Sequence, residues 1–261
     1  MNRLVKRLLA LFIPPVVALN SMLRSLSAAG HHLQYLLQWR FASRMPDSFD
    51  QHIDLHWKWG VTHNPMSWER GIFGLLAMNP GCRLLDLCCG EGFYAQRFYS
   101  CRAGEIVAMD YDRRAIAKAQ RQFAASNITY LCGDIRTEMP QGPFDNVSWN
   151  AGIEYFTPSE INNILGNIKN RLAPEGVLSG YSILMSDSTV PLDGQKYAAG
   201  SREAQGELLG RFFRNVTILR TRFADRFQDR TNHYFFASDG PLPFDENWPN
   251  IKRWTNVPGS P

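Results

Sequence analysis

The sequence predicts an α/β fold: a doubly wound, mostly parallel sheet of seven strands that ends in an antiparallel hairpin, with an N-terminal helical arm. Short apolar runs alternate with helical patterns over residues 83–184, which is typical of a parallel sheet covered on both faces. The last two apolar runs have no helix between them, so they should pair antiparallel. The chain has 261 residues, 44% hydrophobic and 20% charged, which suits one globular domain with appendages.

Each predicted element rests on a local pattern. The strands are short apolar runs, expected at residues 83–87, 105–109, 128–131, 144–149, 177–184, 216–223 and 233–238. Cap residues and apolar residues at helical spacing predict the helices. They are expected at residues 67–76, 93–98, 113–125, 157–172 and 201–213. Thr157, Pro158 and Glu160 form a capping box with proline at the first helical position, and Pro174 and Gly176 should end that helix.

The first 46 residues are basic and partly apolar. They contain six Lys or Arg residues and no Asp or Glu, and the rest of the chain is close to neutral. The apolar run at 8–19 is interrupted by Pro14 and Pro15 and is shorter than the ~20 residues that a membrane-spanning helix needs. We expect residues 1–24 to contact an anionic membrane surface. A helix packed on the body or on another subunit is the second alternative, and a cleaved signal peptide is the third.

Composition also suggests domain limits and a cellular compartment. We expect the arm at 1–46, the α/β domain at 47–240 with an N-terminal lid at 47–68, and an irregular tail at 241–261. The five cysteines match neither a zinc spacing nor a disulfide scaffold, so we expect reduced thiols, no metal site and a cytoplasmic protein, located at the inner face of a membrane if the arm binds lipid. The near-neutral body lacks the basic face that a nucleic-acid partner requires.

A glycine-containing bend follows the first predicted strand. Asp86, Cys88, Gly90 and Gly92 lie in the pattern D-x-x-x-G-x-G, which differs from the G-x-G-x-x-G of dinucleotide-binding folds. Glycine allows a sharp turn and a close approach to a ligand. An ionised Asp86 suits a cationic amino group better than a phosphate. An ordinary strand-to-helix turn is the alternative interpretation.

Acidic residues also follow the second and third predicted strands. Asp110 is placed to accept hydrogen bonds from ribose hydroxyls, with Tyr111 beside it, although Asp110 or Asp112 could instead cap the next helix. Asp134 could accept from an adenine amino group while Ile135 packs on the ring; a surface turn is the alternative.

Together these motifs resemble the class I S-adenosylmethionine-dependent methyltransferases. The resemblance covers roughly residues 50–240, and Cys88 departs from it because the family more often has glycine there. The matching positions are Asp86, Gly90 and Gly92 in motif I, Asp110 and Asp134 after the next two strands, residues 144–150 with Asn150 in motif IV, and residues 172–176 before the fifth strand.

The resemblance implies methyl transfer from S-adenosylmethionine to a small-molecule, glycan or lipid-precursor acceptor, with oxygen as the expected acceptor atom. The protein would align the reacting atoms and exclude water. A hydroxyl acceptor needs a general base, for which Tyr155 and His63 are the candidates, while His56, Trp59 and Glu154 would line the acceptor site. Two other classes remain: a cofactor-binding protein without catalysis, and a nicotinamide oxidoreductase, which would need the absent G-x-G-x-x-G motif.

Overall fold

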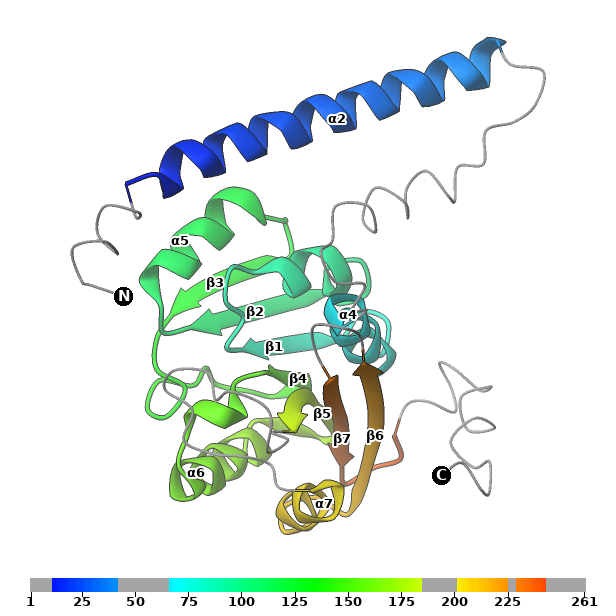
Figure 1. The fold of residues 1–261 in the computed structure, drawn as a ribbon. Helices are drawn as coiled ribbons and strands as arrows, with labels where there is room; N and C mark the ends of the chain where they lie inside the picture. The colour runs from blue at the N-terminus through cyan, green and yellow to red at the C-terminus, as the bar shows by residue number, and fades with distance from the viewer. Residues whose placement is uncertain (1–10, 42–65, 185–200, 225–228, 243–261) are drawn as a thin grey trace. The chain divides into compact units, whose positions relative to one another are not determined.

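The computed structural model describes residues 11–41, 66–184, 201–224 and 229–242 (Figure 1). The chain divides into two compact units, residues 1–63 and 64–261. In the first unit, α2 (Ile13–Phe41) is a helix of 29 residues. Pro14 and Pro15 lie in its first turn, where the backbone N–H groups have no partner within a helix, so they begin the helix and do not interrupt it. Within the described ranges, no helix combines the length and the apolar character needed to cross a bilayer.

The second unit contains a seven-stranded sheet in the order β3-β2-β1-β4-β5-β7-β6 (Figure 1). Strands β1 to β5 are parallel, and β7 runs antiparallel between β5 and β6. The predicted fold class is therefore confirmed, including the antiparallel end of the sheet. The strands are β1 (Arg83–Leu87), β2 (Glu105–Asp110), β3 (Ile128–Cys132), β4 (Phe144–Asn150), β5 (Leu172–Leu184), β6 (Asn215–Ala224) and β7 (Asp229–Ser238).

Helices cover both faces of this sheet. Apolar residues of α6 and α7 pack in one core with the inner strands, and a second core on the other face includes residues of α5 and of the short helix η1. A smaller cluster joins Phe73 of α4 to β5 and β7. The helices are α4 (Met66–Leu76), η1 (Ala95–Tyr99, a π-helix), α5 (Arg113–Gln122), η2 (Ile153–Tyr155, a 3₁₀-helix), α6 (Pro158–Lys169) and α7 (Arg202–Gly210).

The alternation of side chains along β1 decides on which face of the sheet Asp86 lies. Leu85 and Leu87 belong to the core under α6 and α7, whereas Leu84 belongs to the core under α5 and η1. Successive side chains of a strand point to opposite faces. Asp86 therefore lies on the same face as Leu84, near the carboxyl end of the strand.

The connection between α6 and β5 differs from the prediction. The helix ends at Lys169, and β5 begins at Leu172, so Pro174 and Gly176 lie inside the strand range and do not end the helix. The pairing of β5 with β4 shifts register at this point. Arg171 explains the early end of the helix, because its Nε donates to the carbonyl oxygens of Met139 (3.2 Å) and Pro140 (2.9 Å), which fixes the chain against the preceding loop.

We predict opposite effects for two glycine-to-alanine substitutions. A Cβ on Gly180 would lie 2.3 Å from the carbonyl oxygen of Trp149, and backbone cannot easily move aside, so Gly180→Ala should lower the free energy of unfolding by about 1–3 kcal/mol. A Cβ on Gly206, inside α7, would lie 3.8 Å from its nearest neighbour atom, so Gly206→Ala should raise the free energy of unfolding by about 0.5–1 kcal/mol. Urea denaturation measures both; equal stability of the two variants would contradict the packing of β5 on β4.

Candidate functional site

Polar groups gather where the carboxyl ends of the parallel strands meet. Asp86 lies one residue before the end of β1, while Asp110 and Asn150 are the last residues of β2 and β4. β1 pairs with both β2 and β4, so the three ends are neighbours at one edge of the sheet (Figure 1). In open α/β sheets this edge is where ligands bind.

The Asp110 carboxylate holds the bend that follows β1. One oxygen, Oδ2, accepts the backbone N–H of Gly90 at 2.9 Å, and the other, Oδ1, accepts the backbone N–H of Asp112 at 2.9 Å. The backbone N–H of Cys89 also donates to the Met109 carbonyl at 3.0 Å. The bend is therefore attached to the end of β2, and the buried Asp110 has one charge-assisted hydrogen bond on each oxygen.

Three residues of the bend adopt left-handed backbone conformations. They are Cys88 (φ 57°), Gly90 (φ 55°) and Gly92 (φ 81°). A Cβ on Gly90 would meet no atom within 4 Å, whereas a Cβ on Gly92 would lie 2.5 Å from the Tyr130 hydroxyl oxygen. Gly90 thus leaves open space beside the bend, and Gly92 allows close packing. Cys88 stands in a conformation that disfavours any side chain by about 1–2 kcal/mol, which accounts for the glycine more common there in the family.

Asp86 is a buried carboxyl group, only 2% exposed. Burial raises its pKa from 3.8 to about 7; a hydrogen bond with Ser148 opposes the rise, and the negative charge of Asp110 adds to it. A carboxyl group in this state gains most from a nearby positive charge, because a cation would stabilise the ionised form that burial disfavours.

The side chain of Asn150 links β4 to η1. Its Nδ2 donates to the Ser148 hydroxyl at 2.8 Å and to the Tyr99 hydroxyl at 3.1 Å. Burial and then the charge of Asp86 raise the pKa of Tyr99, so this phenol stays neutral. The sequence reasoning missed Ser148 and Tyr99. The position of Ser148, two residues before Asn150 on the same strand face, would have identified it, but no local pattern points to Tyr99.

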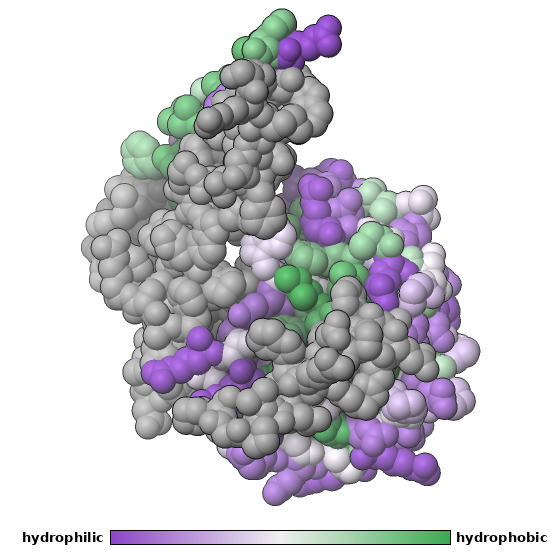
Figure 2. Space-filling view, turned by 90° about the vertical axis from the view of Figure 1, so that its right-hand side faces the viewer, coloured by the Kyte–Doolittle hydropathy of each residue, from purple (hydrophilic) through white to green (hydrophobic). Residues whose placement is uncertain are grey.

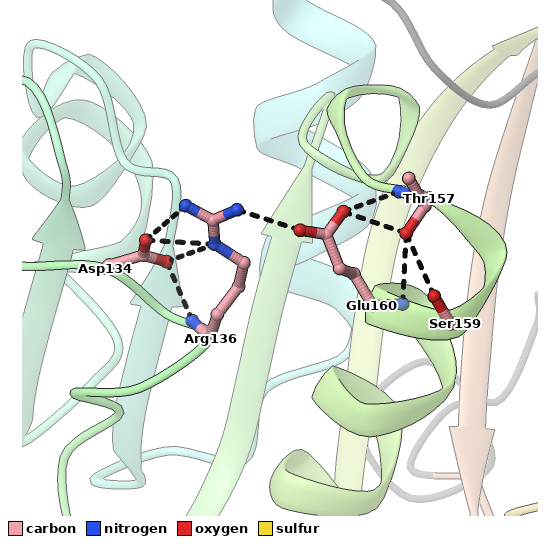
Figure 3. Close-up of polar contacts among 5 residues, drawn as sticks. All are labelled: Asp134, Arg136, Thr157, Ser159 and Glu160. Atoms are coloured by element: carbon pink, nitrogen blue, oxygen red, sulfur yellow. Dashed lines mark hydrogen bonds and ion pairs between the residues drawn. The ribbon is translucent and has the colours of Figure 1, made fainter.

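Asp134 is held by an arginine two residues further along the chain. Its carboxylate accepts the Arg136 backbone N–H at 2.9 Å and guanidinium N–H groups at 2.5 to 3.0 Å (Figure 3). Arg136 also donates to Glu160 at 2.8 Å, and the other oxygen of Glu160 accepts the Thr157 N–H in the capping box. The hydrogen bonds from Arg136 lower the pKa of Asp134. Its contact with adenine stays a prediction, as does that of Ile135, which is buried in the core under α6.

The remaining predicted residues differ in exposure. Tyr111 is 80% exposed just beyond β2, and Tyr155 is 41% exposed in η2. Glu154 is buried, and its charge contributes to the raised pKa of the Cys88 thiol, of which burial is the main cause. The other candidates, His56, Trp59 and His63, lie outside the described residues together with most of the predicted lid.

Asp112, not Asp110, caps α5, since its carboxylate accepts the Arg114 N–H at 2.8 Å. In the part of the chain that is described, no three His, Cys, Asp or Glu side chains are grouped to hold a metal ion.

Comparison with known proteins identifies the same region. Residues 84–176 match the family model of a methyltransferase domain. An uncharacterized methyltransferase of Synechocystis sp. is 28% identical over 106 residues, which are 40% of this chain and 48% of that protein. A tRNA U34 carboxymethyltransferase of Haemophilus influenzae is 26% identical over 176 residues, which are 64% of this chain and 51% of that protein.

A solved structure shares the fold. The N-methyltransferase NodS of Bradyrhizobium japonicum, in complex with S-adenosylhomocysteine, has a TM-score of 0.52 at 20% identity, covering 69% of this chain and 91% of that one. The chain spans about half the length of the curated relatives it matches. The family match supports the resemblance derived from the strand ends over residues 84–176, and the solved structure shows that the fold is shared.

We predict that Asp86 makes stability depend on pH. Because its pKa is raised on folding, its contribution is fully present below pH ~3.8 and is lost as pH rises to about 7. Between about pH 5 and pH 7 the wild type should therefore lose about 1–3 kcal/mol of unfolding free energy relative to Asp86→Asn. Urea denaturation across this range measures the difference.

A second variant distinguishes the titration of Asp86 from the titration of other groups in the chain. Ser148→Ala removes the hydrogen bond that keeps the pKa of Asp86 from rising further. The loss of stability should therefore extend to higher pH in this variant than in the wild type. A wild type and an Asp86→Asn variant with parallel pH profiles would contradict the assignment.

Proposed function

We propose, from the premise that residues 84–176 form a class I S-adenosylmethionine-dependent methyltransferase domain, that this chain methylates a small-molecule, glycan or lipid-precursor acceptor at oxygen. The observation that carries the proposal is the hydrogen bond from the Gly90 N–H to Asp110, which fixes the bend at the edge of the sheet. The reaction would take place in the cytoplasm.

The residues at this edge fit the chemical groups of the cofactor. The buried Asp86 suits its cationic amino group, and the Asp110 oxygens, with one N–H on each, keep acceptor capacity for ribose hydroxyls. The open space beside Gly90 allows a ligand to approach the backbone. When bound, the cofactor supplies an activated methyl group on a sulfonium.

Nucleophilic side chains near the bend are kept unreactive. Burial raises the pKa of the Cys88 and Cys89 thiols and of the Tyr99 phenol. The thiolate and not the thiol is the nucleophile. These groups therefore stay protonated and would be poor nucleophiles toward an activated methyl group.

The acceptor side is proposed at the segment that follows β4. Glu154 and Tyr155 lie in η2 there, and Tyr155 is the more exposed of the two. An oxygen acceptor must lose its proton, and a base within hydrogen-bond reach speeds this step. We assign that role to Tyr155 or to His63, and acceptor contacts to Glu154, His56 and Trp59.

The tRNA-modifying relative suggests nucleic acid as a second candidate acceptor. The charge distribution argues against it. Outside the first 46 positions the Lys and Arg residues are nearly balanced by Asp and Glu, whereas phosphate binding needs an excess of Lys and Arg around the site. Methylation of a nucleic acid is therefore one possible result of the methyl-transfer assay described below, and not the function proposed.

We predict that two matched glycine variants separate binding from stability. Gly81 and Gly90 both have positive φ and open space at Cβ, so either alanine variant should lose about 1–2 kcal/mol of unfolding free energy. Only the Gly90→Ala methyl points into the proposed cofactor space, so its affinity for S-adenosylhomocysteine should fall by about tenfold or more while that of Gly81→Ala is unchanged. Titration calorimetry measures both, and equal affinities would count against the cofactor position.

Single-turnover assays with methyl-labelled S-adenosylmethionine test the reaction. We expect label in a hydroxyl of an acceptor from a panel of phenols, glycans and lipid precursors, and Tyr155→Phe to slow the transfer by about 10²–10⁴-fold without changing cofactor affinity, provided Tyr155 and not His63 is the base. Cofactor that binds but is never demethylated would support the non-catalytic alternative. Label found in tRNA alone would overturn the acceptor class.

A further inference from the structure

We propose that the Cys88 thiol holds the segment after β4 in place against the bend after β1, and is thereby a positioning residue for methyl transfer. This inference deepens the function proposed above and rests on it. It is carried by a contact of Cys88 with Trp149 and Gly152, all three of which belong to the second compact unit. Because the family more often has glycine at position 88, the contact is a property of this chain.

The contact joins the ends of two neighbouring strands. β1 and β4 are paired as far as Leu87 and Trp149, so the chain leaves the sheet at adjacent points after each strand (Figure 1). A Cβ on Gly152 would lie 2.8 Å from the Cys88 sulfur and 2.6 Å from Nε1 of Trp149. The thiol and the indole ring therefore both pack against the backbone of Gly152, where a side chain has no room.

The backbone at both strand ends is strained and held in place. Cys88 (φ 57°) and Ala151 (φ 49°) are the non-glycine residues with positive φ in the described ranges. Side chains disfavour this conformation, which persists where the surroundings enforce it. Next to Cys88, the Cys89 N–H donates to the Met109 carbonyl at 3.0 Å. The Ala151 N–H donates to the Tyr181 carbonyl at 2.9 Å. Both ends therefore follow fixed paths, and the thiol fills the space between them.

The indole ring of Trp149 explains why sulfur suits this position. Trp149 is fully buried, and its Nε1 has no hydrogen-bond partner in the described part of the chain. Burial is the main cause of the raised pKa of the Cys88 thiol and the charge of Asp110 adds to it, whereas the indole N–H opposes the rise. The N–H is therefore close enough to interact with the sulfur electrostatically. Sulfur is a weak acceptor that packs well beside aromatic rings, and a glycine at position 88 would supply neither acceptor nor volume.

The contact lies beneath the surface and connects the two sides of the candidate site. Gly152 is buried and Cys88 is half-buried, whereas Figure 2 shows many hydrophilic residues on the described surface. A shift of the bend would displace Gly152, and with it Glu154 and Tyr155 in η2 on the acceptor side. Methyl transfer needs the reacting atoms in line, and a misplacement of about 1 Å can cost about 10²-fold in rate.

Nuclear magnetic resonance of the full chain tests this coupling without an acceptor. Saturating S-adenosylhomocysteine should move the amide signal of Tyr155 in the wild type, because Cys88 connects the bend to η2. In Cys88→Ala, which removes only the sulfur, the displacement should fall to about half or less. Cys88→Ser keeps an acceptor of similar size and should restore the displacement. Cys101→Ala removes an exposed thiol outside the site and should behave as the wild type.

Transfer rates give a second measurement. With the acceptor identified in the single-turnover assay, Cys88→Ala should slow methyl transfer by about tenfold or more, while its affinity for S-adenosylhomocysteine falls by about threefold or less. A merely structural role would lower rate and affinity together. Cys88→Gly, which the left-handed backbone accommodates more easily, replaces Cys88→Ala in both measurements if the alanine variant does not fold.

The outcomes separate this inference from the proposed function. An equal displacement of the Tyr155 signal in the wild type and in the folded variant, with S-adenosylhomocysteine bound to both, would overturn the inference and leave the proposed function intact. A signal that does not move in the wild type on binding would do the same. A wild type that does not bind S-adenosylhomocysteine would overturn the proposed function, and this inference with it.

Discussion

The Asp110 carboxylate is the constraint on which the site depends. Its two oxygens join the bend after β1 to the start of the segment that leads into α5, through the N–H groups of Gly90 and Asp112. Because the carboxylate is buried, both hydrogen bonds are made away from competing water. The path of the backbone at the edge of the sheet is therefore fixed by the protein itself, and a ligand does not have to order it.

Elements set by local interactions were predicted well. β1 matches its predicted range, and the capping box of Thr157 begins α6 where the sequence placed it. The end of α6 was missed because it depends on Arg171, whose side chain reaches carbonyl oxygens more than 30 residues away in the sequence. Periodicity contains no information about such a contact. Likewise, η1 was predicted as an ordinary helix, and its π-helical hydrogen bonds have no pattern in composition.

Some features of the candidate site could likewise be predicted from the sequence, and others could not. Asp86, Gly90 and Asp110 could be brought together from sequence because the ends of parallel strands share an edge. The raised pKa of Asp86 could not be predicted from the sequence, since it depends on burial and on partners from other strands. Ser148 reaches Asp86 only through the pairing of β4 with β1, and Tyr99 joins them only through the packing of η1.

Asp86 and Asp134 at the carboxyl ends of the strands differ in their surroundings, and the pKa of each is shifted in the opposite direction. Burial raises the pKa of Asp86, so a cation beside it relieves an unfavourable charge. The charge of Asp134 is already compensated by Arg136, so it has little to gain from a cation and is better suited to a neutral N–H donor. The proposed cofactor, with a positive amino group at one end and an uncharged aromatic amine at the other, matches this difference in one orientation.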